Sequence, residues 1–206
     1  DWLRAFPPVA ATGREFDVDP WLLGVENGVV DLQSGAFRAG RREDNVTLTT
    51  GTRYDPTADC PRWRQFLVEV FDDGTRTDEQ VGDLCGFLQR AVGYTLTGTT
   101  REQCFILLYG VGLNGKSVFL GTLGSLFGEY AHSADFATFL VDFRRTGGAA
   151  TPDLAAFEHK RFIAAGEAED GARFSAARLK ALTGSDTITA RALYSGVRTF
   201  QPTFKL

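Results

Sequence analysis

The sequence contains no methionine and few of the residues that build metal sites or disulfide frameworks. Its three cysteines are far apart and odd in number, they form no CxxC pair, and only two histidines accompany them. The sequence therefore predicts neither zinc nor disulfides, and three buried, reduced thiols are expected, as in a cytoplasmic protein. Because methionine is missing even at position 1, we expect the chain to be a segment of a longer protein.

Long apolar runs are also missing. The longest run, residues 104–109, is the size of a strand and far shorter than the roughly 18 residues of a membrane span, so no membrane partner is expected. The chain has 206 residues, of which 43% are hydrophobic and 23% charged, and these values exclude wholesale disorder. Such a length accommodates one domain, or a compact domain with a smaller one attached.

Residues 1–95 combine short strands with two amphipathic helices. Partial alternation predicts the strands, and apolar residues at i, i+3, i+4 and i+7 predict the helices. Pro61 suits the first turn of one helix, and Gly93 is expected to stop the other. We interpret this part as a β-hairpin and a helical collar or linker region. The expected strands are 24–32, 36–38 and 46–50, and the expected helices are 61–71 and 81–92.

Residues 96–206 show alternating strand and helix patterns instead. The apolar run at 104–109 is expected to be a strand buried on both faces of a parallel sheet, followed by a glycine-rich loop and a helix. The fold class that follows is α/β, a P-loop NTPase core preceded by the small α+β region. The other expected strands are 161–165, 187–194, 197–200 and 203–206, and the expected helices are 116–127, a short one starting at 151–153, and 175–182.

The motif GxxxxGK[ST] follows the expected strand and opens the expected helix. Its glycines let successive backbone amides face a polyphosphate, and the helix adds its positive N-terminal end. Lys116 is expected to reach the β- and γ-phosphates of ATP, and the Ser117 hydroxyl to bind Mg²⁺. The predicted nucleotide-binding residues are Gly110, Val111, Gly112, Leu113, Asn114, Gly115, Lys116 and Ser117.

A phosphate loop requires a second acid that holds magnesium and orients water. Glu167 follows the expected buried strand at 161–165 directly, and it is our first candidate for catalysis and for the metal. Glu169 is the second candidate, and Asp170 is read as a solvated loop acid.

Charge is distributed unevenly along the chain. Residues 171–206 carry six basic residues and one acid, a local charge of +5, whereas residues 1–170 carry −9. Such asymmetry indicates either a surface for a polyanion or a solvated basic face.

Several blocks in order resemble the superfamily 3 helicase domain of phage and plasmid primase-helicases, which is related to poxvirus-type NTPases. The resemblance covers nearly everything after residue 20. The matching blocks are NGVVDLQSG (27–35), YDP (54–56), GYTLTG (93–98), LLYGVGLNGKS (107–117), ATPDLAAFEHKRFIAAGE (150–167), LKALTGSDTITARALY (179–194) and FQPTFKL (200–206).

The resemblance implies an AAA+-like core that assembles as a ring, usually a hexamer, and translocates on single-stranded DNA in a bacterial host cell. Lys116, Ser117 and Glu167 match its nucleotide motifs. Its polar sensor and arginine finger would lie beyond Leu206, so the core is expected to be incomplete, and no primase site is recognisable. The family's intervening motif is matched by Lys180, Gly184, Asp186 and Arg191.

In the family that motif leads to a hairpin that grips DNA, which here would span residues 187–200. The DNA-binding candidates are Lys180, Arg191 and Arg198, although Arg191 could instead pair with Asp186 and brace the hairpin. Two other functions stay open: a small-molecule kinase with an acceptor pocket and a lid, and a nucleotide-binding assembly element with little turnover.

Overall fold

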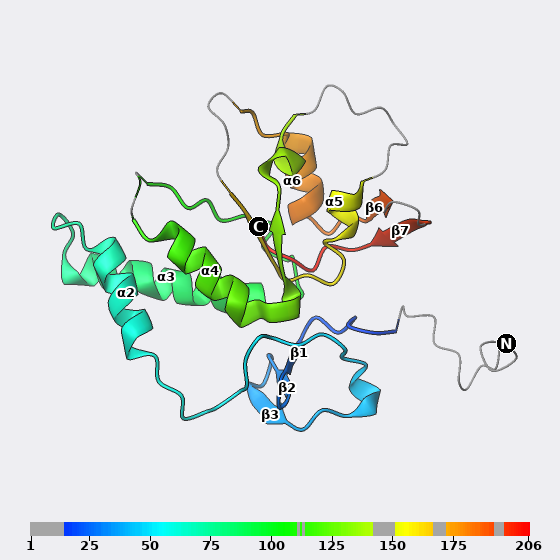
Figure 1. The fold of residues 1–206 in the computed structure, drawn as a ribbon, viewed down its shortest axis with the longest axis horizontal. Helices are drawn as coiled ribbons and strands as arrows, with labels where there is room; N and C mark the ends of the chain where they lie inside the picture. Colours follow the sequence, from blue (N-terminus) through cyan, green and yellow to red (C-terminus); the bar gives the residue numbers. More distant parts are fainter. Residues whose placement is uncertain (1–14, 111, 113, 142–150, 167–171, 192–195) are drawn as a thin grey trace, which may run out of the picture.

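The computed structural model describes residues 15–110, 112, 114–141, 151–166, 172–191 and 196–206. The fold is mixed α/β. A small antiparallel sheet lies beneath helix α4, helices α2 and α3 lie to one side, and the remaining strands and short helices lie on the other side (Figure 1).

The N-terminal sheet has the order β1-β2-β3 and is antiparallel throughout. The single strand predicted at 24–32 is wrong, because the chain turns at Glu26 and Asn27. Val25 pairs with Gly28 across this two-residue turn. The Asn27 side chain also bonds the backbone of Tyr54, accepting from its N–H at 2.8 Å and donating to its carbonyl at 3.0 Å. The three strands are β1 (Leu22–Val25), β2 (Gly28–Asp31) and β3 (Ala36–Arg38).

The strand predicted at 46–50 is not formed, because side chains take the amides of residues 47–49, while the Thr50 amide donates to the Gly24 carbonyl of β1 at 2.9 Å. The Asp17 carboxylate accepts from the amides of Thr47 and Leu48 at 2.8 and 3.1 Å. The Glu129 carboxylate accepts from the amide of Thr49 at 2.8 Å. The Glu129 contact ties the segment to the turn after α4, and the Asp17 contacts tie it to the chain before β1.

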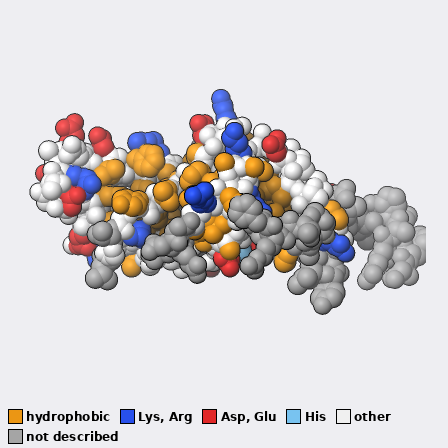
Figure 2. Space-filling model, turned by 90° about the horizontal axis from the view of Figure 1, so that it is seen from above, with side chains coloured by type: hydrophobic (Ala, Val, Ile, Leu, Met, Phe, Trp, Pro, Cys, Tyr) orange, Lys and Arg blue, Asp and Glu red, His pale blue; other side chains and the backbone are white. Residues whose placement is uncertain are grey.

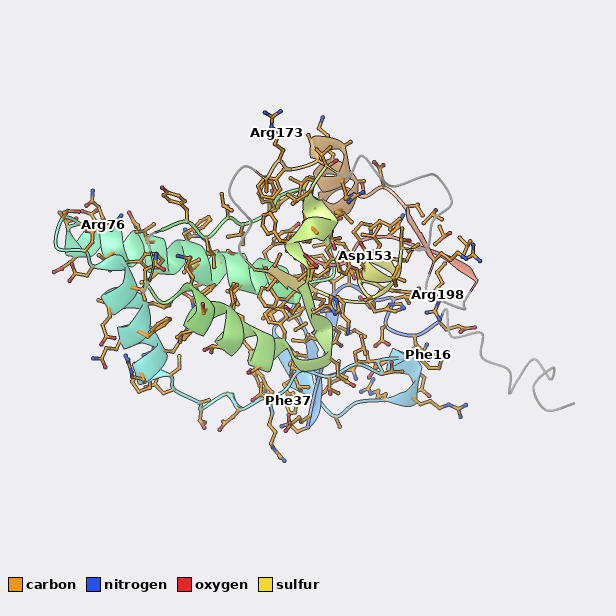
Figure 3. All side chains as sticks on the ribbon, turned by 45° about the horizontal axis from the view of Figure 1, so that its top comes forward. Phe16, Phe37, Arg76, Asp153, Arg173 and Arg198 are labelled. Carbon is orange, nitrogen blue, oxygen red and sulfur yellow. The ribbon has the colours of Figure 1, made fainter. Side chains whose placement is uncertain are left out.

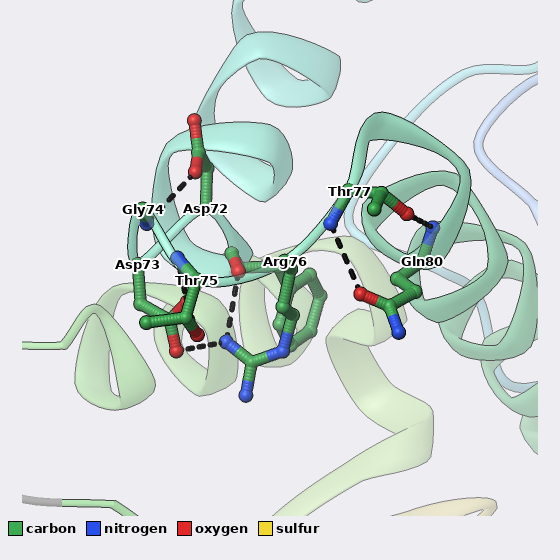
Figure 4. A network of polar contacts seen from close by, with 8 residues as sticks. Asp72, Asp73, Gly74, Thr75, Arg76, Thr77 and Gln80 are labelled. Atoms are coloured by element: carbon green, nitrogen blue, oxygen red, sulfur yellow. Dashed lines mark hydrogen bonds and ion pairs between the residues drawn. The ribbon is translucent and has the colours of Figure 1, made fainter.

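Helix α2 (Pro61–Phe71) has the predicted bounds, and Pro61 occupies its first turn. Helix α3 (Asp78–Leu96) begins with a capping box between Thr77 and Gln80, drawn in Figure 4. Gly93 does not end it. An internal glycine costs only about 1 kcal/mol, and the added turn buries Thr95 and packs Leu96 against the core.

Helix α4 (Lys116–Phe127) also has the predicted bounds, and it packs on a pair of parallel strands. These are β4 (Ala131–Ala134), which the sequence analysis missed, and β5 (Phe162–Ala165), which it predicted. Lys205 extends the sheet by a parallel bridge to Phe162, and the Leu206 carbonyl accepts from the amide of Ile106 at 2.9 Å.

The expected fully buried strand at 104–109 is wrong in part. The segment belongs to no assigned strand, and its side chains alternate between exposed and half-buried. Tyr109 is 94% exposed and Leu107 65%, so only one face of the segment is covered. Figure 2 shows hydrophobic side chains gathered on the upper side of the molecule, among Lys and Arg side chains.

The last part of the chain builds a second core around Phe157, Ile163 and Phe204. The predicted hairpin is present as an antiparallel pair in which Arg191 faces Val197, whereas the predicted end of its first strand and the start of its turn, residues 192–195, lie outside the described residues. Ser175 caps its helix as predicted, by accepting from the amide of Arg178. These elements are α5 (Pro152–Ala155), α6 (Ala176–Thr183), β6 (Ile188–Arg191) and β7 (Val197–Phe200), with 3-10 turns at Arg42–Asp44, Gly128–Tyr130 and Phe136–Phe139.

The cysteines are free but not buried as expected. Cys60 and Cys104 are exposed, and Cys85 is half-buried. Burial raises the pKa of the Cys85 thiol. Among the described helices, none is long and apolar enough to cross a membrane.

Candidate functional site

The predicted phosphate loop lies between the extended segment ending at Tyr109 and the first turn of α4. Gly115 caps the helix with a φ of +78°, the left-handed region that favours glycine. A Cβ on Gly110 would lie 2.1 Å from the Asn114 side-chain nitrogen, so Asn114 folds back over the start of the loop. Val111 and Leu113 lie outside the described residues.

Lys116 turns back onto the loop that it follows. Its ammonium donates to the Gly110 carbonyl at 2.7 Å and to the Asn114 side-chain oxygen at 2.8 Å. A bound anion beside Lys116 would compete with these two oxygens for the protons of its ammonium. The contact between Asn114 and Lys116 could not be predicted from the GxxxxGK[ST] pattern, because the middle positions of the pattern accept any residue.

The end of β5 faces the same space. Lys116, Ser117, Ala165 and Gly166 line one cavity of about 690 Å³. A smaller cavity of about 440 Å³ is also lined by Ser117, Ala165 and Gly166. Gly166 is the residue directly before Glu167, so the chain leaves β5 beside the loop. Glu167, Glu169 and Asp170 themselves lie outside the described residues.

Helix α2 covers the N-terminus of α4. A Cβ on Gly115 would lie 2.7 Å from Val70 Cγ2 and 3.1 Å from Phe66 Cε2. Trp63 stacks on Phe119 with the ring centroids 5.6 Å apart and the planes at 18°. The sequence analysis assigned this aromatic stripe to packing within the collar and did not place it at the loop.

Two basic residues are buried: Arg161, in the expected strand at 161–165, and Lys205, which the charge count had included in the basic segment. Arg161 is 4% exposed, and its guanidinium donates to the carbonyls of Leu96 and Leu22 at 2.5 and 2.6 Å. It also lies over the Tyr130 ring, 4.8 Å from the centroid. Burial, which outweighs the nearby tyrosine and acids, lowers the pKa of Arg161.

Lys205 is 3% exposed, and its ammonium donates to the carbonyls of Thr97 and Thr99 and lies over the Tyr94 ring. Burial, together with the charge of Arg161, lowers the pKa of Lys205 to about 7. Counting Lys205 toward a basic surface is therefore wrong. A charge count cannot show that Lys205 is buried, because it treats every lysine as a surface charge.

The DNA-binding candidates have different surroundings. Lys180 on α6 and Arg191 on β6 are exposed, and neither side chain forms a hydrogen bond or ion pair with another described residue, Asp186 included. Arg198 on β7 forms an ion pair of 2.9 Å with Glu158 (Arg198 is labelled in Figure 3). Arg173, also labelled there, projects from the turn before α6 and is exposed.

Within the described ranges, no group of three or more His, Cys, Asp or Glu residues could hold a metal ion. The Ser117 hydroxyl, at the start of α4, is a hard oxygen ligand of the kind that Mg²⁺ takes. The second predicted ligand, Glu167, lies outside the described residues.

The chain is similar to several viral proteins. The family described as "D5 N terminal like" matches residues 1–72. "Putative helicase L207/L206" of Acanthamoeba polyphaga mimivirus is 31% identical over 205 residues, which cover 93% of this chain and 20% of that protein. "Putative helicase 121R" of Invertebrate iridescent virus 3 is 26% identical over 199 residues, covering 92% of this chain and 20% of that protein.

"Uncoating factor OPG117" of Vaccinia virus is 27% identical over 165 residues, covering 76% of this chain and 20% of that protein. The chain spans about a fifth of the length of these curated relatives. The resemblance stated from the sequence blocks is confirmed in its viral branch, while no phage or plasmid protein is among these three. These matches relate the chain to the D5-like primase-helicases.

Proposed function

We propose that the chain binds Mg–ATP at the loop from Gly110 to Ser117, and that the protein to which it belongs is an ATP-dependent DNA helicase. One observation carries the proposal. Lys116 and Ser117, at the N-terminus of α4, line the same cavity as Ala165 and Gly166, at the end of β5. A phosphate-binding helix start and the end of a neighbouring parallel strand meet in this way in P-loop enzymes.

The arrangement of the sheet supports a P-loop NTPase core of the AAA+-like kind. Hydrogen bonds connect β4 to β5, β5 to Lys205, and Leu206 to Ile106, in that order. The segment that leads into the loop therefore lies next to the Lys205 segment, with β5 beyond it. Helix α4 packs against β4 and β5, as a crossover helix of a parallel sheet does.

Each residue then has a definite role. Lys116 neutralises charge on the β- and γ-phosphates, and the Ser117 hydroxyl ligates Mg²⁺. Glu167 completes the magnesium site and orients the attacking water, with Glu169 as the second candidate. The bound Mg²⁺ supplies charge neutralisation at the transferred phosphoryl group.

Translocation on single-stranded DNA is the finer part of the proposal. The names of the mimivirus and iridescent virus relatives support a helicase. The exposed Lys180 and Arg191 supply phosphate contacts from α6 and β6. Assembly as a hexameric ring, and the phage- or plasmid-type origin in a bacterial cytoplasm, stay predictions from the sequence resemblance.

The test compares two lysine-to-alanine variants. Lys116→Ala should weaken Mg–ATP binding about tenfold or more, because it removes a charge-assisted contact to phosphate. Lys180→Ala, which changes an exposed lysine on α6, should bind ATP like the wild type. Binding of a fluorescent ATP analogue gives the affinities, and circular dichroism checks that both variants fold.

Hydrolysis tests the acid and the nucleic acid. In the complete protein, Glu167→Gln should bind Mg–ATP but turn it over slowly, and single-stranded DNA should stimulate hydrolysis by the wild type. Equal ATP affinity in Lys116→Ala and wild type would refute the nucleotide site. If Glu169→Gln hydrolyses ATP slowly and Glu167→Gln is active, the catalytic acid is Glu169 and not Glu167. Phosphoryl transfer to a small acceptor without DNA stimulation would favour a kinase.

A further inference from the structure

Helix α2 touches the candidate nucleotide site from outside the motif. The contact is closest at Gly115, the residue directly before Lys116. The Cβ that any other residue would carry there meets Val70 at 2.7 Å and the Phe66 ring at 3.1 Å. The backbone at Gly115 is thus confined twice, by its left-handed φ of +78° and by α2 above it.

A stack of aromatic rings extends this contact along the first turn of α4. Trp63 lies between Phe66, at a centroid distance of 5.4 Å, and Phe119, at 5.6 Å. The Phe119 amide donates to the Gly115 carbonyl at 2.9 Å, so the two ends of this helical turn are also joined to each other. Val70 and the ring stack therefore hold the turn at both ends.

This turn presents the groups that would face phosphate. Lys116 and Ser117 are its first helical residues, and the free amides at a helix N-terminus point along the axis toward a bound anion. Anion binding through several amides depends on their common orientation, which here is set by the conformation at Gly115. Side chains packed on the outer side of this turn fix the orientation of these amides, and they would thereby affect nucleotide affinity without contacting the nucleotide.

We propose that α2 is a positioning element of the nucleotide site, in which Trp63, Phe66 and Val70 hold Gly115 and the first turn of α4 in the binding conformation. The inference rests on the proposed ATP site. The match to the D5 N-terminal-like family ends at residue 72, one residue beyond α2. The contact therefore joins the part of the chain that this family covers to the phosphate loop.

A matched pair of variants on the same helix tests the proposal. Val70 contacts Gly115, whereas Val68, two residues away, is 47% exposed. Val70→Ala should weaken Mg–ATP binding about fivefold, and Phe66→Ala by at least as much. Val68→Ala, the same chemical change, should leave the affinity at the wild-type value. Thermal unfolding is measured for every variant, so that a loss of stability is separated from a loss of affinity.

A second measurement uses the predicted clash. Gly115→Ala should bind ATP poorly, because the new Cβ meets Val70 and the φ is unfavourable. Adding Val70→Ala removes the closest clashing atom, so the double variant should bind ATP more tightly than Gly115→Ala alone. Val70→Ala thus weakens binding in the wild type and strengthens it in the Gly115→Ala background, a reversal that general destabilisation does not produce.

The outcomes distinguish a failure of the α2 proposal from a failure of the proposed nucleotide site. If Lys116→Ala loses ATP while Val70→Ala and Phe66→Ala keep wild-type affinity, the nucleotide site stands and the role of α2 is overturned. An equal loss in Val68→Ala, or no reversal in the double variant, overturns it as well. If Lys116→Ala and the wild type do not differ, the proposed function itself fails.

Discussion

Lys205 is a basic side chain that the fold removes from water, and no carboxylate of the described residues contacts its ammonium. Its ammonium is held by the carbonyls of Thr97 and Thr99 and by the Tyr94 ring. Carbonyl dipoles compensate only part of the lost hydration, which is why its pKa falls from 10.5 to about 7. Protonation of this side chain is therefore coupled to folding.

The sign of that coupling gives a prediction. Between pH 7 and 10.5 the unfolded lysine holds a proton that the folded one has largely lost, so the free energy of unfolding should increase with pH. Between pH 7.5 and 9 the wild type should gain about 1–2 kcal/mol relative to Lys205→Met. Urea unfolding at several pH values measures it, with Lys180→Met as the exposed control. Equal pH slopes in wild type and Lys205→Met would show that the folded lysine keeps its proton and that burial does not lower its pKa.

The hairpin of β6 and β7 is the element on which the DNA proposal depends. Its basic residues are not equivalent: Arg191 is exposed, whereas Arg198 pairs with Glu158 and links β7 to the turn after α5. A surface ion pair of this kind stabilises by only about 0–1 kcal/mol. Arg198 can therefore exchange Glu158 for a DNA phosphate at small cost, or serve only as a brace.

A salt series distinguishes these roles. Lys180→Ala and Arg191→Ala should weaken single-strand binding with little regard to base sequence, and each should flatten the log-log salt dependence by about 0.7. Arg198→Ala should do the same if it contacts DNA, whereas Glu158→Ala should leave binding intact or strengthen it. Equal, small losses of stability in Arg198→Ala and Glu158→Ala, with unchanged salt slopes, would assign the pair to bracing. Unchanged affinity in all the arginine and lysine variants would leave this surface without a DNA role.

Helices were predicted better than strands, for a physical reason. The periodicity of α2 and α4 is local, and their ends are marked by Pro61 and by the glycine loop. A strand depends on the partner beside it, which lies elsewhere in the sequence. Residues 46–50 have the composition of a strand, yet the carboxylates of Asp17 and Glu129 take its amides.

In the candidate site, too, local features could be predicted from the sequence and contacts between distant segments could not. The loop from Gly110 to Ser117 is contiguous and can be found from spacing alone. Its contact with α2 cannot, because a helical pattern shows which face is apolar but not what that face covers. The burial of Lys205 was missed because composition counts a lysine as exposed by default.

At the scale of the whole molecule, Arg161 joins the N-terminal sheet to the parallel strands. It lies at the start of β5 and donates to Leu22 in β1 and to Leu96 at the end of α3. Its ring contact with Tyr130 adds a third link, because the Tyr130 hydroxyl accepts from the Gly24 amide at 3.1 Å. One side chain thus connects the two parts of the chain.

Removing that connection should be costly. Arg161→Met leaves buried carbonyls without a donor and should lower the free energy of unfolding by about 3 kcal/mol. It should also speed proteolytic cleavage after α3, since that segment loses its anchor. Denaturant unfolding and limited proteolysis measure both effects, with Arg90→Met, an exposed change on α3, as the control. A variant as stable and as resistant as that control would show that the guanidinium is dispensable.

The two exposed thiols lie at the ends of segments that meet at the candidate nucleotide site. Cys60 precedes α2, the proposed brace, and Cys104 begins the segment that leads into the loop. Cys85 on α3 is half-buried, and burial raises the pKa of its thiol, so partial burial and a smaller thiolate fraction both slow its reaction with maleimides. The native chain therefore offers two attachment points for spin labels or fluorophores. A change in their separation when Mg–ATP is added would report movement of α2 relative to the loop without an engineered cysteine.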